Sequence, residues 1–346
     1  MTIRFAHWEK QAAFGLLLAF CLVVTLAAIA LSVRTGDLPI SPSTTFYAVT
    51  NRLGWTAVSL NRIHESVVMD YRLSRALAAA CCGAGLALCG AVLQSLLRNA
   101  LAEPYVLGIS AGASTGAVAV VILGLGAGAV TLSMGAFAGA FMAFLFVALL
   151  SNGTRGGTDR TILAGVAASQ LFNALTSYIV TTAADAQQAR DIMFWLLGSF
   201  GGVRWPDVQL VSVVVLVGFV LCLAHSRVLD AFTFGDDAAA SLGIPVGRTR
   251  VLLFAATALM AATIVSIVGS IGFVGLVVPH AVRFLVGPLH ARVLPACVVA
   301  GAIFMVLADI ASRIVVPQQV LPIGVVTALV GVPFFSLILY RAKRFS

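Results

Sequence analysis

The chain has 346 residues, of which 60% are hydrophobic and only 10% are charged. Together with a mean hydropathy of +1.05, this composition excludes an ordinary soluble globular domain and predicts a polytopic membrane protein. Lysine and arginine outnumber aspartate and glutamate by 21 to 13, which gives a formal net charge of +8. In a membrane protein such an excess is typical of cytoplasmic loops, so we do not expect nucleic acid as a partner.

Ten apolar segments follow one another along the chain and predict about ten transmembrane helices. Only helices satisfy their own backbone hydrogen bonds across lipid at these lengths, so the predicted fold class is all-α, with residues 1–346 as one transmembrane domain. The first segment is longer than the core of a cleaved signal peptide, and we expect it to span the membrane. The predicted spans are 11–33, 73–97, 104–124, 129–150, 161–182, 208–225, 249–268, 271–287, 293–315 and 323–340.

The arginines indicate the orientation. Ten spans place both termini on one side, and with the N-terminus in the cytoplasm 13 of the 21 basic residues fall at inside ends and loops. This bias favours cytoplasmic termini. Five of the other eight gather between or near the first two spans, namely Arg34, Arg52, Arg62, Arg72 and Arg75. The positive-inside bias does not explain why these five arginines gather on the outer side.

Small residues recur within the spans at spacings that allow close helix packing. Examples are GAGLALCG at 83–90, GISAGASTG at 108–116 and GAFAG at 135–139. Small residues four apart let helix backbones approach closely where lipid offers no hydrophobic drive. The pattern predicts a large, compact helix bundle.

The sequence lacks the usual motifs of ATP hydrolysis and of zinc-dependent hydrolysis, GxxxxGK[ST] and HExxH. GxSxG occurs only as GISAG and GASTG within the small-residue run 108–116, inside a predicted transmembrane helix and not at the strand-to-helix turn of a nucleophile elbow, so we expect a protein that is not an enzyme. The six cysteines lie in apolar runs without CxxC spacing, and we expect no disulfide, metal site or cofactor. Charge within the spans is rare. Asp309 and Arg313, spaced i, i+4, predict a local ion pair.

The stretch from Thr233 to Arg250 is polar but sits between two apolar runs, on the predicted cytoplasmic side. GDDAAASLGI predicts a short helix, because Asp236 and Asp237 suit its first turn and Gly243 followed by Pro245 would end it. Such a helix is too short to span a membrane. It is either a simple connection or an element that inserts into a groove of a soluble partner.

Several stretches together resemble the FecCD family, the permease subunits of ABC importers for ferric siderophores, haem and cobalamin. The resemblance runs from about residue 70 to the C-terminus and keeps the family's order. Its motifs are RLSRALAAACCGAGLALCGAVLQSLLRNALAEPYVLGISAGAS at 72–114, MFWLLGSFGG at 193–202, GDDAAASLGIPVGRTR at 235–250, GSIGFVGLVVPHAVR at 269–283, ADIASR at 308–313 and LPIGVVTALVGVPFF at 321–335. Any one of them alone is weak, whereas the set is specific.

The resemblance implies a ten-helix permease of the bacterial inner membrane that forms a homodimer around the substrate path. Two separate ATPase subunits would bind ATP and dock on the cytoplasmic side, and a periplasmic binding protein would deliver the substrate. The absence of a phosphate-binding loop agrees with this division of labour. In family members the loop that matches residues 230–248 contacts the ATPase, which here implies coupling roles for Phe234, Gly235, Asp236, Asp237, Ala239, Leu242 and Gly243.

The resemblance also implies roles at the outer face and along the path. The family's RLxR and ADxxxR arginines pair with glutamates of the binding protein, and they match Arg72, Arg75 and Arg313. Guanidinium groups engage carboxylates bidentately, which suits such docking, while snorkelling at the membrane interface is the alternative without the family. An inner gate precedes the fifth span, at Thr158 and Asp159, and Arg190 falls at the outer mouth.

The substrate is open at this stage. The family prior favours an iron compound, with haem first and a ferric siderophore second, and cobalamin as the alternative. A rival of another class is an ion-coupled secondary transporter, which would require acids at mid-depth that the sequence mostly lacks. A membrane scaffold without transport would leave the ordered motifs unexplained.

Overall fold

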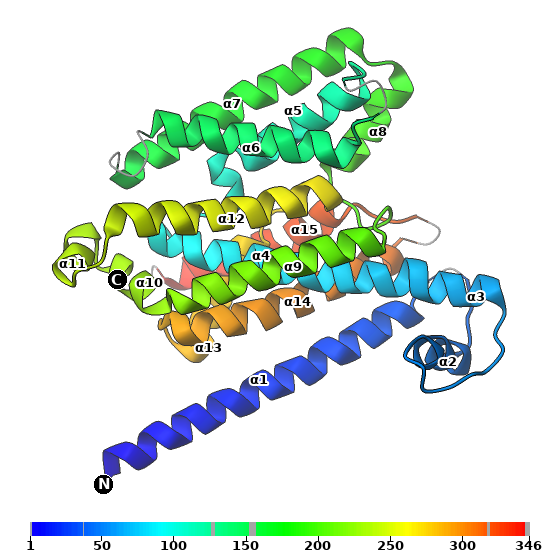
Figure 1. Cartoon of the computed structure of the whole chain (residues 1–346), viewed down its shortest axis with the longest axis horizontal. Helices are drawn as coiled ribbons and strands as arrows, with labels where there is room; N and C mark the ends of the chain where they lie inside the picture. Colours follow the sequence, from blue (N-terminus) through cyan, green and yellow to red (C-terminus); the bar gives the residue numbers. More distant parts are fainter. Residues whose placement is uncertain (1, 37, 126–128, 152–156, 317–318, 343–346) are drawn as a thin grey trace.

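The structure is a computed structural model. It describes the backbone of residues 2–36, 38–125, 129–151, 157–316 and 319–342, and the side chains in these ranges except residues 2–11, 157–158, 337–339 and 341–342. Within these ranges all regular elements are helical (Figure 1). They are α1 (Thr2–Arg34), α2 (Pro42–Arg52), α3 (Arg62–Ser66), a π-helical segment (Val67–Leu73), α4 (Ser74–Leu96), a 3₁₀ turn (Pro104–Leu107), α5 (Ile109–Val121), α6 (Leu132–Leu150), α7 (Gly157–Ala183), α8 (Ala186–Leu196), α9 (Trp205–Ala224), α10 (Ser226–Thr233), α11 (Asp236–Ser241), α12 (Val246–Val268), α13 (Val274–Val286), α14 (His290–Ile314) and α15 (Ile323–Ala342).

The predicted all-α membrane fold is confirmed, and each predicted span coincides with a helix. Seven of these helices, α1, α4 with its preceding turns, α6, α7, α9, α12 and α14, are long and apolar enough to cross a membrane. The other three, α5, α13 and α15, contain shorter apolar helices. Two of them start after left-handed backbone, at Gly108 (φ +71°) before α5 and at Phe273 (φ +69°) before α13. These turns let both helices begin inside the bundle.

The helix α4 forms the centre of the bundle and is surrounded by α9, α12, α13 and α14. Two glycine pairs explain how closely these neighbours approach. Gly83 faces Gly301 of α14, and Gly90 faces Gly275 of α13. A Cβ at Gly83 or Gly90 would overlap the facing backbone carbonyl, so only glycine fits at these positions. The small-residue pattern therefore serves tight packing, as the sequence predicts.

The bundle has two distinct ends and two distinct flanks. The helices α10 and α11 lie at one end, where α1 begins and α15 ends, while α2 and α3 lie at the other (Figure 1). The helices α1 and α7 occupy opposite flanks (Figure 1). Both are mostly exposed, with 22% of their most apolar window buried. The charged side chains of interest gather at the two ends.

Candidate functional site

Arg72, in the π-helical segment before α4, is buried against the end of α1. Its guanidinium donates to the carbonyls of Val33 at 3.3 Å, Arg34 at 3.2 Å and Leu38 at 2.6 Å. The last carbonyls of a helix lack intrahelical partners and carry partial negative charge, which favours a cation there. Gly36 leaves room for it, because a Cβ would lie 2.7 Å from Nη2 of Arg72. Arg72 thus fastens α1 to the start of α4.

Asp309, near the end of α14, is fully buried between two arginines. Arg75 of α4 donates from Nε to Oδ1 at 2.8 Å, and Nη2 of Arg313 lies 3.0 Å from Oδ2. Arg313 also donates to the carbonyl of Thr35 at 2.6 Å and to Oγ of Ser32 at 2.7 Å. Buried charges require such pairing because desolvation is costly. One network therefore joins α1, α4 and α14.

The structure brings together the three arginines that the motifs single out, Arg72, Arg75 and Arg313. Three positive charges face one aspartate, so this arginine cluster is positive overall. Arg75 and Arg313 expose 14% and 9% of their side chains, and Arg72 is buried. The predicted i, i+4 pair of Asp309 and Arg313 is confirmed. Its link to Arg75 was not predicted, because 234 residues separate Arg75 from Asp309.

The opposite end carries the predicted short helix, α11, which runs from Asp236 to Ser241. Gly235 (φ +108°) precedes it, and Gly243 (φ +79°) follows it. Asp236 accepts from Arg250 of α12 at 2.5 Å, and this ion pair fixes α11 against the bundle. Its first turn thus carries negative charge, as the helix dipole favours. The helix α10 was not predicted, since its eight residues carry no sequence signal separate from α9.

The residues of the predicted coupling segment fall into two groups. Phe234 and Leu242 are 82% and 72% exposed, and Asp237 is also exposed. Ala239 is fully buried and contributes packing. Apolar side chains exposed at a bundle end, beside a short rigid helix, form a surface suited to a protein partner.

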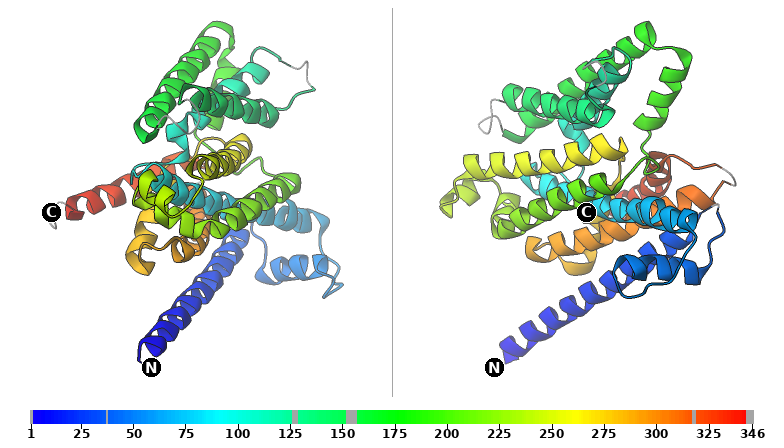
Figure 2. Two further views of the ribbon diagram at one scale, coloured as in Figure 1. Left: turned by 60° about the vertical axis from the view of Figure 1, so that its left-hand side comes forward. Right: turned by 45° about the vertical axis from the view of Figure 1, so that its right-hand side comes forward.

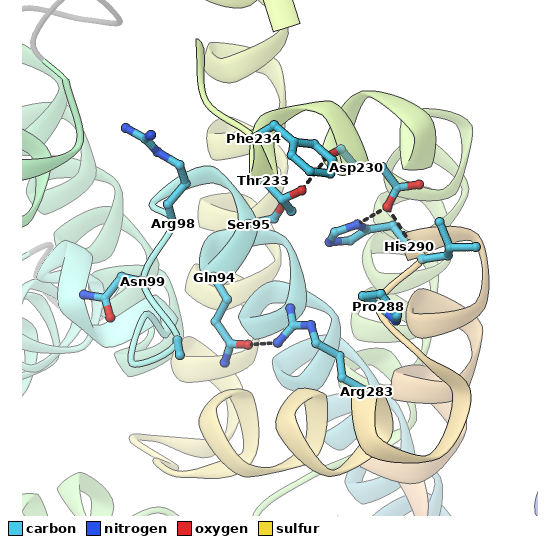
Figure 3. A pocket seen from close by; sticks show the side chains of 12 residues that line it. Gln94, Ser95, Arg98, Asn99, Asp230, Thr233, Phe234, Arg283, Pro288 and His290 are labelled. Atoms are coloured by element: carbon cyan, nitrogen blue, oxygen red, sulfur yellow. Dashed lines mark hydrogen bonds and ion pairs between the residues drawn. The ribbon is translucent and has the colours of Figure 1, made fainter. Parts of the chain in front are cut away.

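A pocket of about 420 Å³ opens beside this surface (Figure 3). It lies between the end of α4, α10 and the connection from α13 to α14. Eight of its twelve lining residues have polar side chains. The pocket was not predicted, because its parts are distant in sequence. The lining residues are Gln94, Ser95, Arg98, Asn99, Ala100, Asp230, Thr233, Phe234, Arg283, Pro288, Leu289 and His290.

Two polar pairs define the pocket wall. Oδ1 of Asp230 accepts from the backbone N–H of His290 at 2.9 Å and lies 2.6 Å from its Nδ1. Nε2 of His290 is buried without a hydrogen-bond partner among the described residues. Arg283 donates to Oε1 of Gln94, whereas Arg98 extends away from the other side chains (Figure 3). The Asp230–His290 pair ties α10 to the first turn of α14.

The residues predicted to line the translocation path lie at opposite ends. Asp159 is exposed in the first turn of α7, and the side chain of Thr158 lies outside the described residues. Arg190 is exposed on α8, where it donates to Oε1 of Gln187 at 3.1 Å. The helix α8 lies at the α2 end of the bundle (Figure 1). The structure thus does not bring these residues together.

The arrangement offers charge recognition rather than bond-making chemistry. Within the described ranges, no group of three or more His, Cys, Asp or Glu side chains is placed to hold a metal ion. The two charged sites lie at opposite ends of helices that cross the bundle. The helix α14 reaches both, because it begins at His290 and carries Asp309 and Arg313 near its end.

Comparisons with known proteins agree with this geometry. The model of the FecCD transport family matches residues 22–341. The cobalamin import system permease protein BtuC of Halobacterium salinarum is 38% identical over 323 residues, covering 91% of this chain and 83% of that protein. The vitamin B12 import system permease protein BtuC of Citrobacter koseri is 37% identical over 325 residues, 93% of each chain. A solved inward-facing structure, described as a metal-chelate type ABC transporter, superposes with a TM-score of 0.82 at 29% identity, covering 94% of this chain and 99% of that one.

Proposed function

This chain belongs to the FecCD transport family and is a permease subunit of an ABC importer, and from that premise we propose that its substrate is a cobalamin-type corrinoid. The observation that carries the proposal is the likeness, over nine-tenths of the chain, to permeases named for cobalamin import in an archaeon and a bacterium. Haem and ferric siderophores, which the family prior ranks first, become the second candidates. The permease itself is not catalytic, and ATP would be hydrolysed by a partner.

The α10–α11 end is the proposed cytoplasmic end, with both chain termini on that side of a bacterial inner membrane. Two ATPase subunits would dock there on the exposed side chains of Phe234 and Leu242. Two contacts support this role. The ion pair of Asp236 with Arg250 would transmit a displacement of α11 to α12, and the contact of Asp230 with His290 would transmit a displacement of α10 to α14. The permease would then change between two conformations if the ATP-bound and ATP-free forms of the ATPase subunits differ in their affinity for these conformations.

The arginine cluster at the α2 end is the proposed dock for a periplasmic binding protein. Its net positive charge supports the attraction of acidic groups on such a partner. Arg75 and Arg313 would meet a partner's carboxylates at their exposed edges, while Arg72 would hold α1 in place for them. The mostly exposed helix α7 supports a homodimer with the substrate path beside it, where Asp159 and Thr158 would sit at the inner mouth and Arg190 at the outer one.

Uptake into proteoliposomes tests the proposal. The permease is reconstituted with its ATPase subunit, and the binding protein is supplied loaded with cobalamin, haem or a ferric siderophore. We expect ATP-dependent uptake of cobalamin alone, and loss of uptake in the Arg75→Glu/Arg313→Glu variant. The Arg204→Glu variant, changed at an exposed arginine just before α9 at the same end, is the matched control. Uptake of haem instead would overturn the substrate, and uptake without ATPase or nucleotide would favour an ion-coupled carrier.

A further inference from the structure

The helix α2 lies across the bundle rather than along it. Figure 1 views it nearly end-on beside the end of α1, and Figure 2 shows it from the side, whereas α1, α4 and α9 follow the long direction of the bundle. Its start is fixed locally, because Ser41 accepts the backbone N–H of Thr44 at 3.1 Å and Pro42 opens the first turn. If α1 and α4 cross a membrane, α2 lies parallel to its surface.

The outward face of α2 is apolar, which reverses the usual pattern of a surface helix. Phe46 and Leu53, seven positions apart and hence on one face, are 62% and 56% exposed. The opposite face is already packed, with Ala48 fully buried against the π-helical segment and its neighbours. Trp55, just beyond the helix, is 76% exposed. Large apolar and aromatic side chains that point away from the protein require another apolar surface.

The loop that carries Trp55 is ordered by its own hydrogen bonds. Asn51 donates from Nδ2 to the carbonyl of Val58 at 2.7 Å, and its Oδ1 accepts from the backbone N–H of Val58 at 3.1 Å. The same oxygen accepts from the hydroxyl of Thr56 at 2.7 Å. The exposure of Trp55 is therefore a property of a folded loop rather than of a loose one.

The charges around this face are mainly positive. Arg52 ends α2 and Arg62 begins α3, and both are exposed. Between residues 38 and 66 the sequence has one acid, the half-buried Glu65. Arginines beside an aromatic and aliphatic surface match the phosphates that border the apolar part of a lipid bilayer.

We propose that residues 42–63 form an interfacial segment that lies on the membrane, with Phe46, Leu53 and Trp55 at the boundary between headgroups and acyl chains. Lipid is the favoured occupant because α2 lies beside the end of α1, a mostly exposed span whose Leu26 and Leu31 are 59% and 50% exposed, and because the arginines around α2 match lipid phosphates. The segment also lies on the flank opposite α7. An interfacial helix buries its apolar face by about 5–10 Å.

This placement has a consequence for the arginine cluster. The end of α1 supplies the carbonyls that Arg72 and Arg313 bind, and α2 follows it after a short connection. An interfacial segment would hold that end of α1 at a fixed height in the membrane. The segment would thereby keep the acceptors of the cluster in position.

Fluorescence of Trp55 tests the proposal. The full chain with Trp8→Phe, Trp195→Phe and Trp205→Phe is placed in nanodiscs of phosphatidylcholine and phosphatidylglycerol in equal parts, which leave both faces open to the buffer. We expect phospholipid brominated near the headgroup to reduce Trp55 emission about twofold or more, as burial at the headgroup boundary implies. Lipid brominated near the chain end should quench less, and iodide in the buffer should quench weakly.

A matched control places the only tryptophan elsewhere at the same end. Trp55→Phe with Gly202→Trp uses an exposed position that has no atom within 4 Å of an added Cβ, and its emission should respond to iodide but not to brominated lipid. If Trp55 behaves like this control, the proposal is overturned and a protein partner becomes the occupant. Should the tryptophan-depleted chain not fold, the difference between the natural chain and its Trp55→Phe variant gives the same measurement.

Discussion

The two ends of the bundle differ in how far their functional side chains are buried. At the α2 end, Asp309 is enclosed with Arg75 and Arg313, and Arg313 uses further donors on the carbonyls of Ser32 and Thr35 at and just beyond the end of α1. At the α11 end, a pocket remains open and Phe234 stands almost fully exposed. An enclosed ion-pair network fixes helices relative to one another. An exposed surface with apolar and polar side chains, such as the one at the α11 end, is available to a protein partner. Arg75 and Arg313 therefore serve the fold first, and only the exposed 14% and 9% of their side chains are left for the proposed docking.

The variant Asp309→Asn should break the enclosed network with the largest effect. It leaves Arg75 and Arg313 buried beside a neutral side chain, and removing one partner of a buried ion pair costs about 3–5 kcal/mol. We expect a marked fall in the Tm of the purified protein, followed by circular dichroism. Asp237→Asn, an exposed acid at the other end, should leave the Tm unchanged. Equal Tm values for the two variants would contradict the role of Asp309.

A triple variant sharpens the same point. Arg75→Met, Asp309→Leu and Arg313→Met together remove all three charges and keep similar volume, so much of the lost stability should return. The binding-protein dock should nevertheless fail, because the proposed contacts are gone. Recovered stability with unaltered docking would mean that these arginines serve the fold alone.

The sequence predicts more of the fold than of the site. The ten spans follow from apolar length, because the constraint that lipid places on the backbone is local and strong. The helix at Asp236 also follows from local signals, the acids of its first turn and the glycine after its end. The contact of Arg75 with Asp309 depends on how α4 packs on α14, and no short-range pattern encodes it. The pocket wall of Asp230 and His290 is unpredicted for the same reason.

Arg72→Met should have the next largest effect. It removes three hydrogen bonds from a charged donor, two to the last carbonyls of α1 and one to the carbonyl of Leu38 beyond it, and bonds to charged groups contribute about 1.5–3 kcal/mol. Since these bonds hold the last residues of α1 and the connection after them, we expect faster hydrogen exchange of backbone amides at residues 31–38, measured by mass spectrometry in nanodiscs. Arg62→Met, an exposed arginine nearby, is the control. Unchanged exchange at residues 31–38 would show that Arg72 does not fasten α1.

At the open end, Phe234→Ser with Leu242→Ser should leave the Tm unchanged and weaken binding of the ATPase subunit. Exposed apolar anchors that become buried at an interface typically contribute about 1–2 kcal/mol each, so we expect a loss of affinity of tenfold or more. Binding is measured with the purified subunits in detergent. Leu53→Ser, the same change at the other end, should bind the ATPase normally. A large fall in Tm would place Phe234 and Leu242 in the fold and not at an interface.

The smallest expected change in stability concerns the Asp230–His290 pair. This pair tests whether side-chain contacts at the α11 end also hold α10 against α14. Because Asp230 is partly exposed, its contact should contribute only about 1 kcal/mol. A double-mutant cycle of Asp230→Asn and His290→Gln, read from unfolding of the purified protein, should give a coupling energy of that size. Zero coupling would mean that α10 moves independently of α14. A value near that of Asp309 would mean that the α11 end is as firmly closed as the α2 end, and the contrast between them would rest on exposure of Phe234 and Leu242 alone.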